Sequence, residues 1–127
     1  MRRTILISIA AMLAIAPATG DAASSKRGKA CPGGSVCVWS KKNFRGEREV
    51  IDKKGATNLS RELNNNVSSV KDRSNGNDYL MDAKNGRTND DYQCLLLPQY
   101  RDLSEIGWNN VTTSVLRSRP GDPKIVC

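Results

Sequence analysis

Two copies of one polar motif hold the side chains of this sequence that are best suited to binding chemistry. The first copy is Asn64-Asn65-Asn66-Val67-Ser68-Ser69, and the second is Asn109-Asn110-Val111-Thr112-Thr113-Ser114. Both follow the pattern Asn-Asn-x-x-Ser/Thr-Ser, and a polar string that recurs at this spacing indicates a duplicated structural unit. The amide and hydroxyl oxygens of the motif are the type of ligand that a hard cation such as calcium takes.

The same residues also have a purely structural interpretation. Asn side chains suit tight turns, and Ser69 and Ser114 can form hydrogen bonds within the neighbouring hairpin loops. Every Asn/Asp position of the motif is a neutral Asn. Because calcium affinity rises with ligand charge, any calcium binding should be weak. The sequence leaves both interpretations open.

The chain has no histidine. This excludes Ser-His-Asp and Cys-His catalysis, and it removes the commonest general base near neutral pH. Carboxylates remain, but none of them has a distinctive setting, and solvated surface charge explains them better than acid–base catalysis does. We therefore predict a binding protein and not an enzyme.

The four cysteines allow three disulfide pairings. A Cys31–Cys37 bond is favoured because the Pro-Gly-Gly segment between these residues suits a turn, and this choice leaves Cys94 with Cys127. A zinc site is disfavoured because these spacings, without histidine, match no standard arrangement. Disulfides in a small domain are typical of secreted proteins.

The elements that would position these residues are short strands. Apolar or alternating segments are separated by clusters of Gly, Asn, Asp and Ser, which is typical of an all-β sandwich with antiparallel connections. Only residues 58–63 and 102–106 suggest helix, and each is about one turn long. The predicted strands are residues 36–39, 47–51, 67–71, 79–81, 92–97 and 111–116.

The N-terminal segment predicts export. Two arginines follow Met1, an uncharged apolar segment follows them, and small residues then provide a cleavage site, so residues 1–23 are interpreted as a signal peptide. Residues 24–30 form a basic spacer, which we expect to be flexible, and residues 31–127 suffice for one domain. The formal net charge of the whole chain is +7, but most of its basic residues are scattered. We expect a secreted, extracellular monomer that binds neither nucleic acid nor, after cleavage, membrane.

Residues 39–46 followed by residues 64–70 resemble the Greek-key motif of the βγ-crystallins, with its aromatic hairpin and serine-bearing strand. The second copy is weaker, because Lys84 stands at its inner aromatic position. The resemblance implies one βγ-crystallin-like domain, a β-sandwich of two Greek keys at residues 35–72 and 78–118. Crystallin motifs exchange calcium ligands, so the resemblance implies weak calcium binding. The implied ligands are Asn64, Asn65, Ser68, Asn109, Asn110 and Thr113. We expect the core to include Trp39, Phe44, Tyr79 and Val115.

Residues 31–39 are similar to the start of the secreted bacterial peptidase inhibitors of family I36. This resemblance implies a protease partner of the metalloprotease type. Cys94-Leu95-Leu96-Leu97-Pro98 resembles the inhibitory loop of that family, with Leu95 presented to the hydrophobic pocket of the protease. Gln99 stands where a second loop cysteine would be expected.

Three alternatives remain open. An uninterrupted leucine run also fits a strand buried on both faces. The whole chain also fits a calcium-binding structural module without inhibitory activity. A secreted toxin or cell-wall-active protein on the same scaffold is the third possibility.

Overall fold

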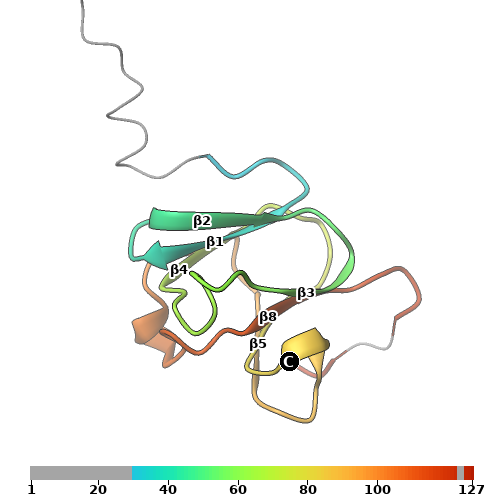
Figure 1. Ribbon diagram of the computed structural model, residues 1–127. Coiled ribbons are helices and arrows are strands. Elements are labelled where there is room, and N and C mark those ends of the chain that lie inside the picture. Colours follow the sequence, from blue (N-terminus) through green and yellow to red (C-terminus); the bar gives the residue numbers. More distant parts are fainter. Residues whose placement is uncertain (1–29, 123–124) are drawn as a thin grey trace, which may run out of the picture.

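Two four-stranded antiparallel sheets form the fold (Figure 1). They are seen in a computed structural model, which describes residues 30–122 and 125–127. The first sheet has the order β2-β1-β4-β7 and the second has the order β3-β8-β5-β6. The strands are β1 (Val36–Lys41), β2 (Arg45–Ile51), β3 (Gly55–Asn58), β4 (Ser69–Asp72), β5 (Asp78–Met81), β6 (Tyr92–Cys94), β7 (Gln99–Tyr100) and β8 (Ser114–Arg117). The predicted all-β fold of two Greek-key motifs is confirmed.

The predicted signal peptide, residues 1–23, lies outside the described residues, as does the predicted spacer apart from Ala30. Within the described part of the chain, no helix is long and apolar enough to cross a membrane.

Each motif contributes one strand to the sheet of the other. β3 pairs with β8 in the second sheet, and β7 pairs with β4 in the first. The sequence pattern missed β3, because its Gly-Ala-Thr-Asn sequence has no run of β-branched or large apolar residues. The exchange joins the two motifs around one core, since neither sheet is built from a single motif.

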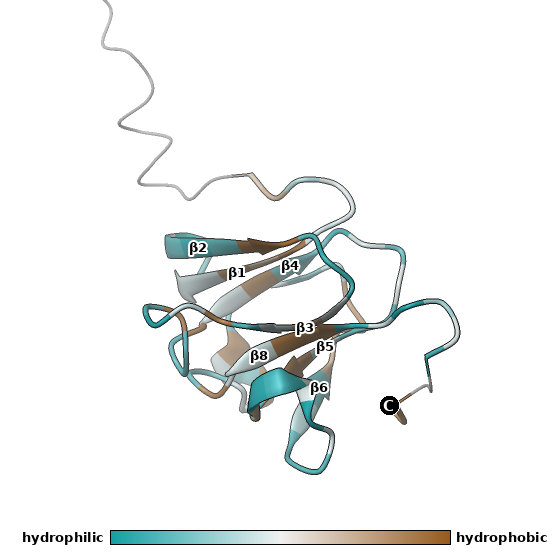
Figure 2. Cartoon of the chain, turned by 45° about the vertical axis from the view of Figure 1, so that its right-hand side comes forward, coloured by the Kyte–Doolittle hydropathy of each residue, from teal (hydrophilic) through white to brown (hydrophobic). Residues whose placement is uncertain are grey.

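The main core lies between the two sheets, where the apolar segments of the strands face one another (Figure 2). All four residues predicted to be buried are at most 7 % exposed, and they are Trp39, Phe44, Tyr79 and Val115. The principal core cluster contains Val36, Val38, Ile51, Leu59, Leu63, Val67, Val70, Leu80, Leu95, Leu103, Trp108 and Val115.

The two hairpins show why the first copy of the motif is easier to recognise. The Trp39 and Phe44 rings pack edge-to-face with centroids 5.3 Å apart, as in the aromatic hairpin that residues 39–46 resemble. In the second motif, Tyr79 packs edge-to-face against Tyr92 with centroids 6.5 Å apart. Tyr92 therefore supplies the aromatic partner that Lys84 cannot.

The two motif serines stabilise the hairpin loops. Ser69 Oγ accepts a hydrogen bond from the backbone N–H of Phe44 at 3.0 Å and donates to the Lys41 carbonyl. Ser114 Oγ accepts from Gly86 N–H at 3.2 Å and also donates to a backbone carbonyl of its own motif. For these two serines the structural interpretation is confirmed.

Two disulfides and one short helix also follow the sequence predictions. Cys31 is bonded to Cys37, and Cys94 is bonded to Cys127. The helix η2 (Leu103–Ile106) is a 3-10 helix, and the Asp102 side chain caps it by accepting from Ser104 N–H. Residues 58–63 do not form a helix, because Asn58 ends β3 and a turn covers residues 61–65. A short helix that was not predicted, η1 (Lys84–Gly86), lies in the second hairpin.

Candidate functional site

An exposed loop of four residues connects β6 with β7, where the chain passes from the second sheet to the first. Leu96 is 73 % exposed and Leu97 is 57 % exposed, and Pro98 is also exposed. Side chains of this size are normally withdrawn from water. Two adjacent exposed leucines make this loop a candidate contact surface.

Leu95 does not belong to the exposed part of the loop. Its side chain is 8 % exposed and packs in the core cluster between the sheets. The prediction that Leu95 is presented to a protease is therefore wrong. The competing interpretation, a strand buried throughout residues 94–97, is also wrong, because β6 ends at Cys94 and the side chains of Leu96 and Leu97 are exposed to solvent.

Hydrogen bonds hold both ends of the loop. At its start, Leu95 N–H donates to the carbonyl of Asp78 at 3.0 Å. At its end, the Pro98 carbonyl accepts from Asp72 N–H at 2.9 Å. The Cys94–Cys127 disulfide adds a covalent anchor immediately before the loop. The start of the loop is therefore held to β5 and its end to β4, so the loop is fixed to both sheets.

Tyr100 orders the middle of the loop. Its hydroxyl oxygen accepts hydrogen bonds from the backbone N–H groups of Leu96 and Leu97, at 3.0 and 3.1 Å. Pro98 adds a restricted φ angle. The resembled inhibitors would close this loop with a second cysteine, where this sequence has Gln99, and the sequence pattern does not point to Tyr100. The tyrosine takes part of that role through hydrogen bonds within the loop.

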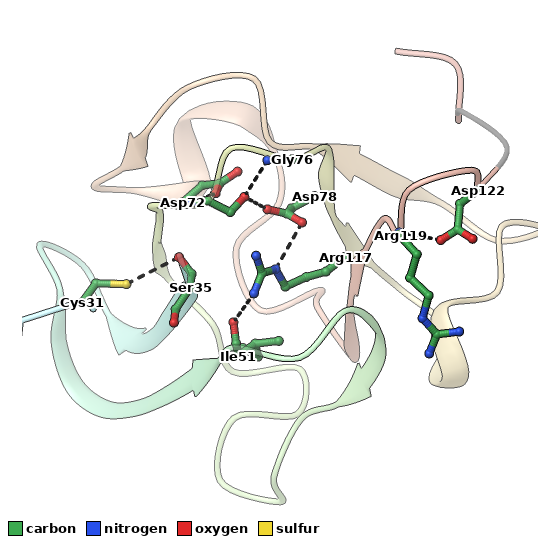
Figure 3. Close-up of polar contacts among 10 residues, drawn as sticks. Cys31, Ser35, Ile51, Asp72, Gly76, Asp78, Arg117, Arg119 and Asp122 are labelled. Atoms are coloured by element: carbon green, nitrogen blue, oxygen red, sulfur yellow. Dashed lines mark hydrogen bonds and ion pairs between the residues drawn. The ribbon is translucent and has the colours of Figure 1, made fainter. Parts of the chain in front are cut away.

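A buried ion pair includes Asp78, the residue whose carbonyl holds the start of the loop (Figure 3). The Arg117 guanidinium bonds to Asp78 Oδ1 at 3.3 Å and to the Ile51 carbonyl at 3.1 Å, and both charged side chains are at most 2 % exposed. The other Asp78 oxygen accepts from the Ser74 hydroxyl. Arg117 therefore links the second sheet to the first next to the strand that holds the start of the loop.

Asp72 lies next to this ion pair. Burial raises the pKa of Asp72 above its ordinary value of 3.8, and the negative charge of Asp78 raises it further. Hydrogen bonds from Ser74 act in the opposite direction, and the backbone N–H of Ser74 donates to Asp72 Oδ1 at 2.9 Å. Since the N–H of Asp72 holds Pro98, the end of the loop is attached to a titratable residue whose pKa is raised by burial.

The two polar motifs meet across the sandwich. Asn65 N–H donates to the Thr112 carbonyl at 2.9 Å, and Asn110 N–H donates to the Val67 carbonyl at 3.0 Å. Asn65 and Asn110 both have left-handed backbone angles, with φ of 54° and 60°. Asn therefore forms turns here, as the structural interpretation predicts.

Some of the predicted calcium ligands lie close together. Thr113 Oγ1 donates to Asn65 Oδ1 at 3.1 Å, which brings a hydroxyl of one motif to an amide of the other. Asn109 Oδ1 is buried and has no hydrogen-bond partner. No group of three or more His, Cys, Asp or Glu side chains suited to a metal occurs among the described residues. The donors available at the motifs are thus neutral amides, hydroxyls and carbonyls.

Solved structures confirm the type of fold. A structure from work on the evolution of the eye lens βγ-crystallin domain fold has a TM-score of 0.60 and 22 % identity, covering 71 % of this chain and 91 % of that chain. Spherulin 3a from Physarum polycephalum has a TM-score of 0.54 and 22 % identity, covering 75 % and 92 %. A domain of Abundant Perithecial Protein from Neurospora crassa, in its Ca²⁺-bound form, has a TM-score of 0.51 and 15 % identity, covering 76 % and 100 %.

Comparison with curated proteins gave no match. A family model does match: that of peptidase inhibitor family I36 aligns with residues 24–93, more than half of the 127 residues. The match contains the Cys31–Cys37 disulfide and the complete first motif, and it ends immediately before Cys94. The chain therefore belongs to peptidase inhibitor family I36, on a βγ-crystallin fold.

Proposed function

We propose that this protein is a secreted, non-catalytic inhibitor of an extracellular peptidase, and that it binds its target through the Leu96–Pro98 loop. The observation that carries the proposal is the exposure of Leu96 and Leu97 on a loop whose two ends and two central amides are hydrogen-bonded. A segment held in one conformation loses little entropy on binding, so more of its contact energy appears as affinity.

The chemistry of the loop favours a peptidase with a hydrophobic specificity pocket. Buried apolar anchors dominate the energy of most interfaces, and Leu96 and Leu97 are the two large apolar side chains that the loop offers. Metallopeptidases of the thermolysin type take a hydrophobic residue just after the cleaved bond, so they are the target class that we propose. Membership of an inhibitor family supports the general role, and the loop supports this particular class.

An inhibition screen tests the proposal. Residues 24–127 would be assayed against thermolysin, a serine peptidase and a cysteine peptidase. We expect inhibition of thermolysin, and we expect Leu96→Ser with Leu97→Ser to weaken it at least tenfold. The matched control is Ile106→Ser, which removes another exposed aliphatic side chain, 39 % exposed, in the helix η2. Inhibition that is lost equally in the control, or absent against all three enzymes, would refute the proposal.

A second candidate function, weak calcium binding, is favoured by one specific observation. Asn109 Oδ1 is buried without a hydrogen-bond partner, and a bound cation would satisfy it. Together with the Asn65–Thr113 contact, it gives each motif a polar oxygen suited to calcium. Asn64, Asn65, Ser68, Asn109, Asn110 and Thr113 remain the proposed ligands. Calcium would stabilise the junction of the two motifs, and the absence of carboxylates from the motifs predicts weak affinity.

A further inference from the structure

The outward face of the first sheet is basic: the strand positions paired with its central residues include an arginine and a lysine but no acidic residue. Cys37 and Trp39 of β1 point away from the main core and form a second, smaller cluster. The strand register places four residues beside them on this face, and these are Arg48, Val50, Ser69 and Lys71. Side chains alternate along a strand, so Glu47, Glu49 and Asp72 fall on the opposite side of their strands.

Four basic residues define this surface, which we call the basic face: Arg48, Lys71, Arg73 and Arg101. Lys71 Nζ lies 4.4 Å from the centroid of the Phe44 ring, and Arg101 Cζ lies 5.4 Å from it. The Arg48 and Arg73 guanidinium groups bond to the carbonyls of Ala30 and Cys31, which cross the same face.

None of the four residues is neutralised by a carboxylate. The described part of the chain has two ion pairs, Lys42–Asp102 and Arg117–Asp78, and neither involves the basic face. Lys71 and Arg101 converge on one aromatic ring, so their charges repel each other with no anion between them. Binding an acidic group at this point would relieve that repulsion.

The basic face adjoins the exposed loop. Lys71 of β4 pairs with Gln99, which directly follows Pro98. An open depression between the loop and the end of β4 is lined by the basic residues Lys71 and Arg73 and by Pro98, and one acidic residue, Asp72, also lines it. A partner that covers the loop would therefore also meet the basic face.

We infer that the basic face is a second contact surface, and that it selects a peptidase whose active-site rim is acidic. The inference rests on the proposed function, and it adds the electrostatic character of the target. Complementary charge around a short binding loop raises the association rate more than it lowers the dissociation rate. A nucleic-acid partner fits less well, because the aromatic rings of this face, Trp39 and Phe44, are buried and cannot stack on bases.

Charge reversal on the basic face tests the inference. In the test variant, Arg73→Glu is combined with Arg101→Glu, since both residues are exposed. The control combines Lys84→Glu with Arg87→Glu, which are also exposed, lie in the second hairpin and produce the same change in net charge. Circular dichroism and melting curves would first establish that both variants are folded.

Two probes keep the outcomes separate. With thermolysin, the association rate constant of the unmodified protein should fall as the salt concentration rises. At low ionic strength, the association rate constant of the test variant should be about tenfold lower than that of the unmodified protein, and that of the control should stay within about twofold. The dissociation rate should change little. On immobilised poly-L-glutamate, the test variant should elute at lower salt than the control.

The inference and the proposed function can fail independently. If thermolysin is not inhibited but poly-L-glutamate binding depends on Arg73 and Arg101, the proposed target fails and the acidic-ligand surface stands. If both variants behave alike toward both probes, the inference is overturned even where thermolysin is inhibited. Duplex DNA binding that the test variant loses, with poly-L-glutamate binding unchanged, would identify a nucleic-acid surface and would also overturn it.

Discussion

The Tyr100 hydroxyl oxygen accepts hydrogen bonds from the backbone N–H groups of both Leu96 and Leu97, at 3.0 and 3.1 Å. One side chain from β7 therefore holds the two residues that the loop exposes most. A phenol oxygen can accept two hydrogen bonds, so this arrangement uses its accepting capacity fully. The relationship makes Tyr100 a positioning residue for the proposed inhibitory loop.

Tyr100→Phe should therefore affect inhibition more than stability. The loop amides are exposed and can bond to water instead, so the loss of unfolding free energy should be about 1 kcal/mol or less. The loop would gain conformational freedom, and we expect the inhibition constant toward thermolysin to rise about tenfold, which corresponds to about 1.4 kcal/mol.

Tyr92→Phe is the matched control for that measurement. The Tyr92 hydroxyl donates to the Val126 carbonyl at 2.8 Å, so the same atom is removed from another exposed hydrogen bond. Inhibition should be unchanged in this variant. Equal inhibition by the Tyr100→Phe variant and the unmodified protein would show that the hydroxyl does not order the loop.

Substitution of Leu95 should mainly lower stability, whereas substitution of Leu97 should mainly weaken inhibition. Leu95→Ala opens a cavity in the core cluster, so it should lower the free energy of unfolding by about 2–4 kcal/mol. Leu97→Ala removes an exposed side chain, so it should lower stability by less than about 0.5 kcal/mol and should weaken inhibition. Chemical denaturation and inhibition constants of the two variants measure both effects. A stable Leu95→Ala variant would contradict the burial of this side chain.

The contrast between these leucines shows which features the sequence predicts and which it does not. The aromatic hairpin, the repeated Asn-Asn motif and the Pro-Gly-Gly turn are local signals, and each predicted its local structure correctly. The direction of each leucine in residues 95–97 depends on where β6 ends. That point is set by the passage of the chain between sheets, which leaves no periodic signal in three identical residues.

Contacts between distant residues explain the other omissions. Tyr100 acts on residues three and four positions before it, but nothing in its sequence setting distinguishes it from other tyrosines. The Asp78–Arg117 pair and the basic face form only when the fold brings β2, β4, β5, β7 and β8 together. Arg48 lies on one face of the first sheet, and Glu47 and Glu49 lie on the other. Predicting this requires the strand register, which a pattern of short strands does not provide.

Asp72 should make stability depend on pH. Its pKa is raised in the folded protein above the ordinary 3.8, chiefly by burial, so the folded state binds more protons than the unfolded state between those two values. The free energy of unfolding contributed by this residue should therefore fall as pH rises from about 4 through the folded pKa.

Asp72→Asn removes this dependence and keeps an oxygen that can accept from Ser74 N–H. The free energy of unfolding of the variant, relative to that of the unmodified protein, should therefore increase as the pH rises from acidic to neutral. Urea unfolding midpoints at several pH values between about 3 and 8 give the comparison. A constant difference between the two proteins over that range would contradict the raised pKa.

Calcium binding can be tested at Asn109, whose buried Oδ1 has no hydrogen-bond partner. Asn109→Asp places a carboxylate at that position. Without calcium, the variant should be less stable than the unmodified protein, because a buried charge lacks compensation. With calcium, the added negative ligand should raise affinity, so the melting temperature of the variant should rise more steeply with calcium concentration.

Asn89→Asp, at an exposed position in the second hairpin, makes the same chemical change and should respond to calcium as the unmodified protein does. Thr113→Ala should reduce the response, since it removes the hydroxyl that contacts Asn65. Melting curves in a chelator and at about 10 mM calcium, above the weakest range of natural calcium modules, decide the question. If the melting temperatures of all four proteins are the same with and without calcium, the polar motifs are turn-forming elements of the sandwich and the calcium proposal is refuted.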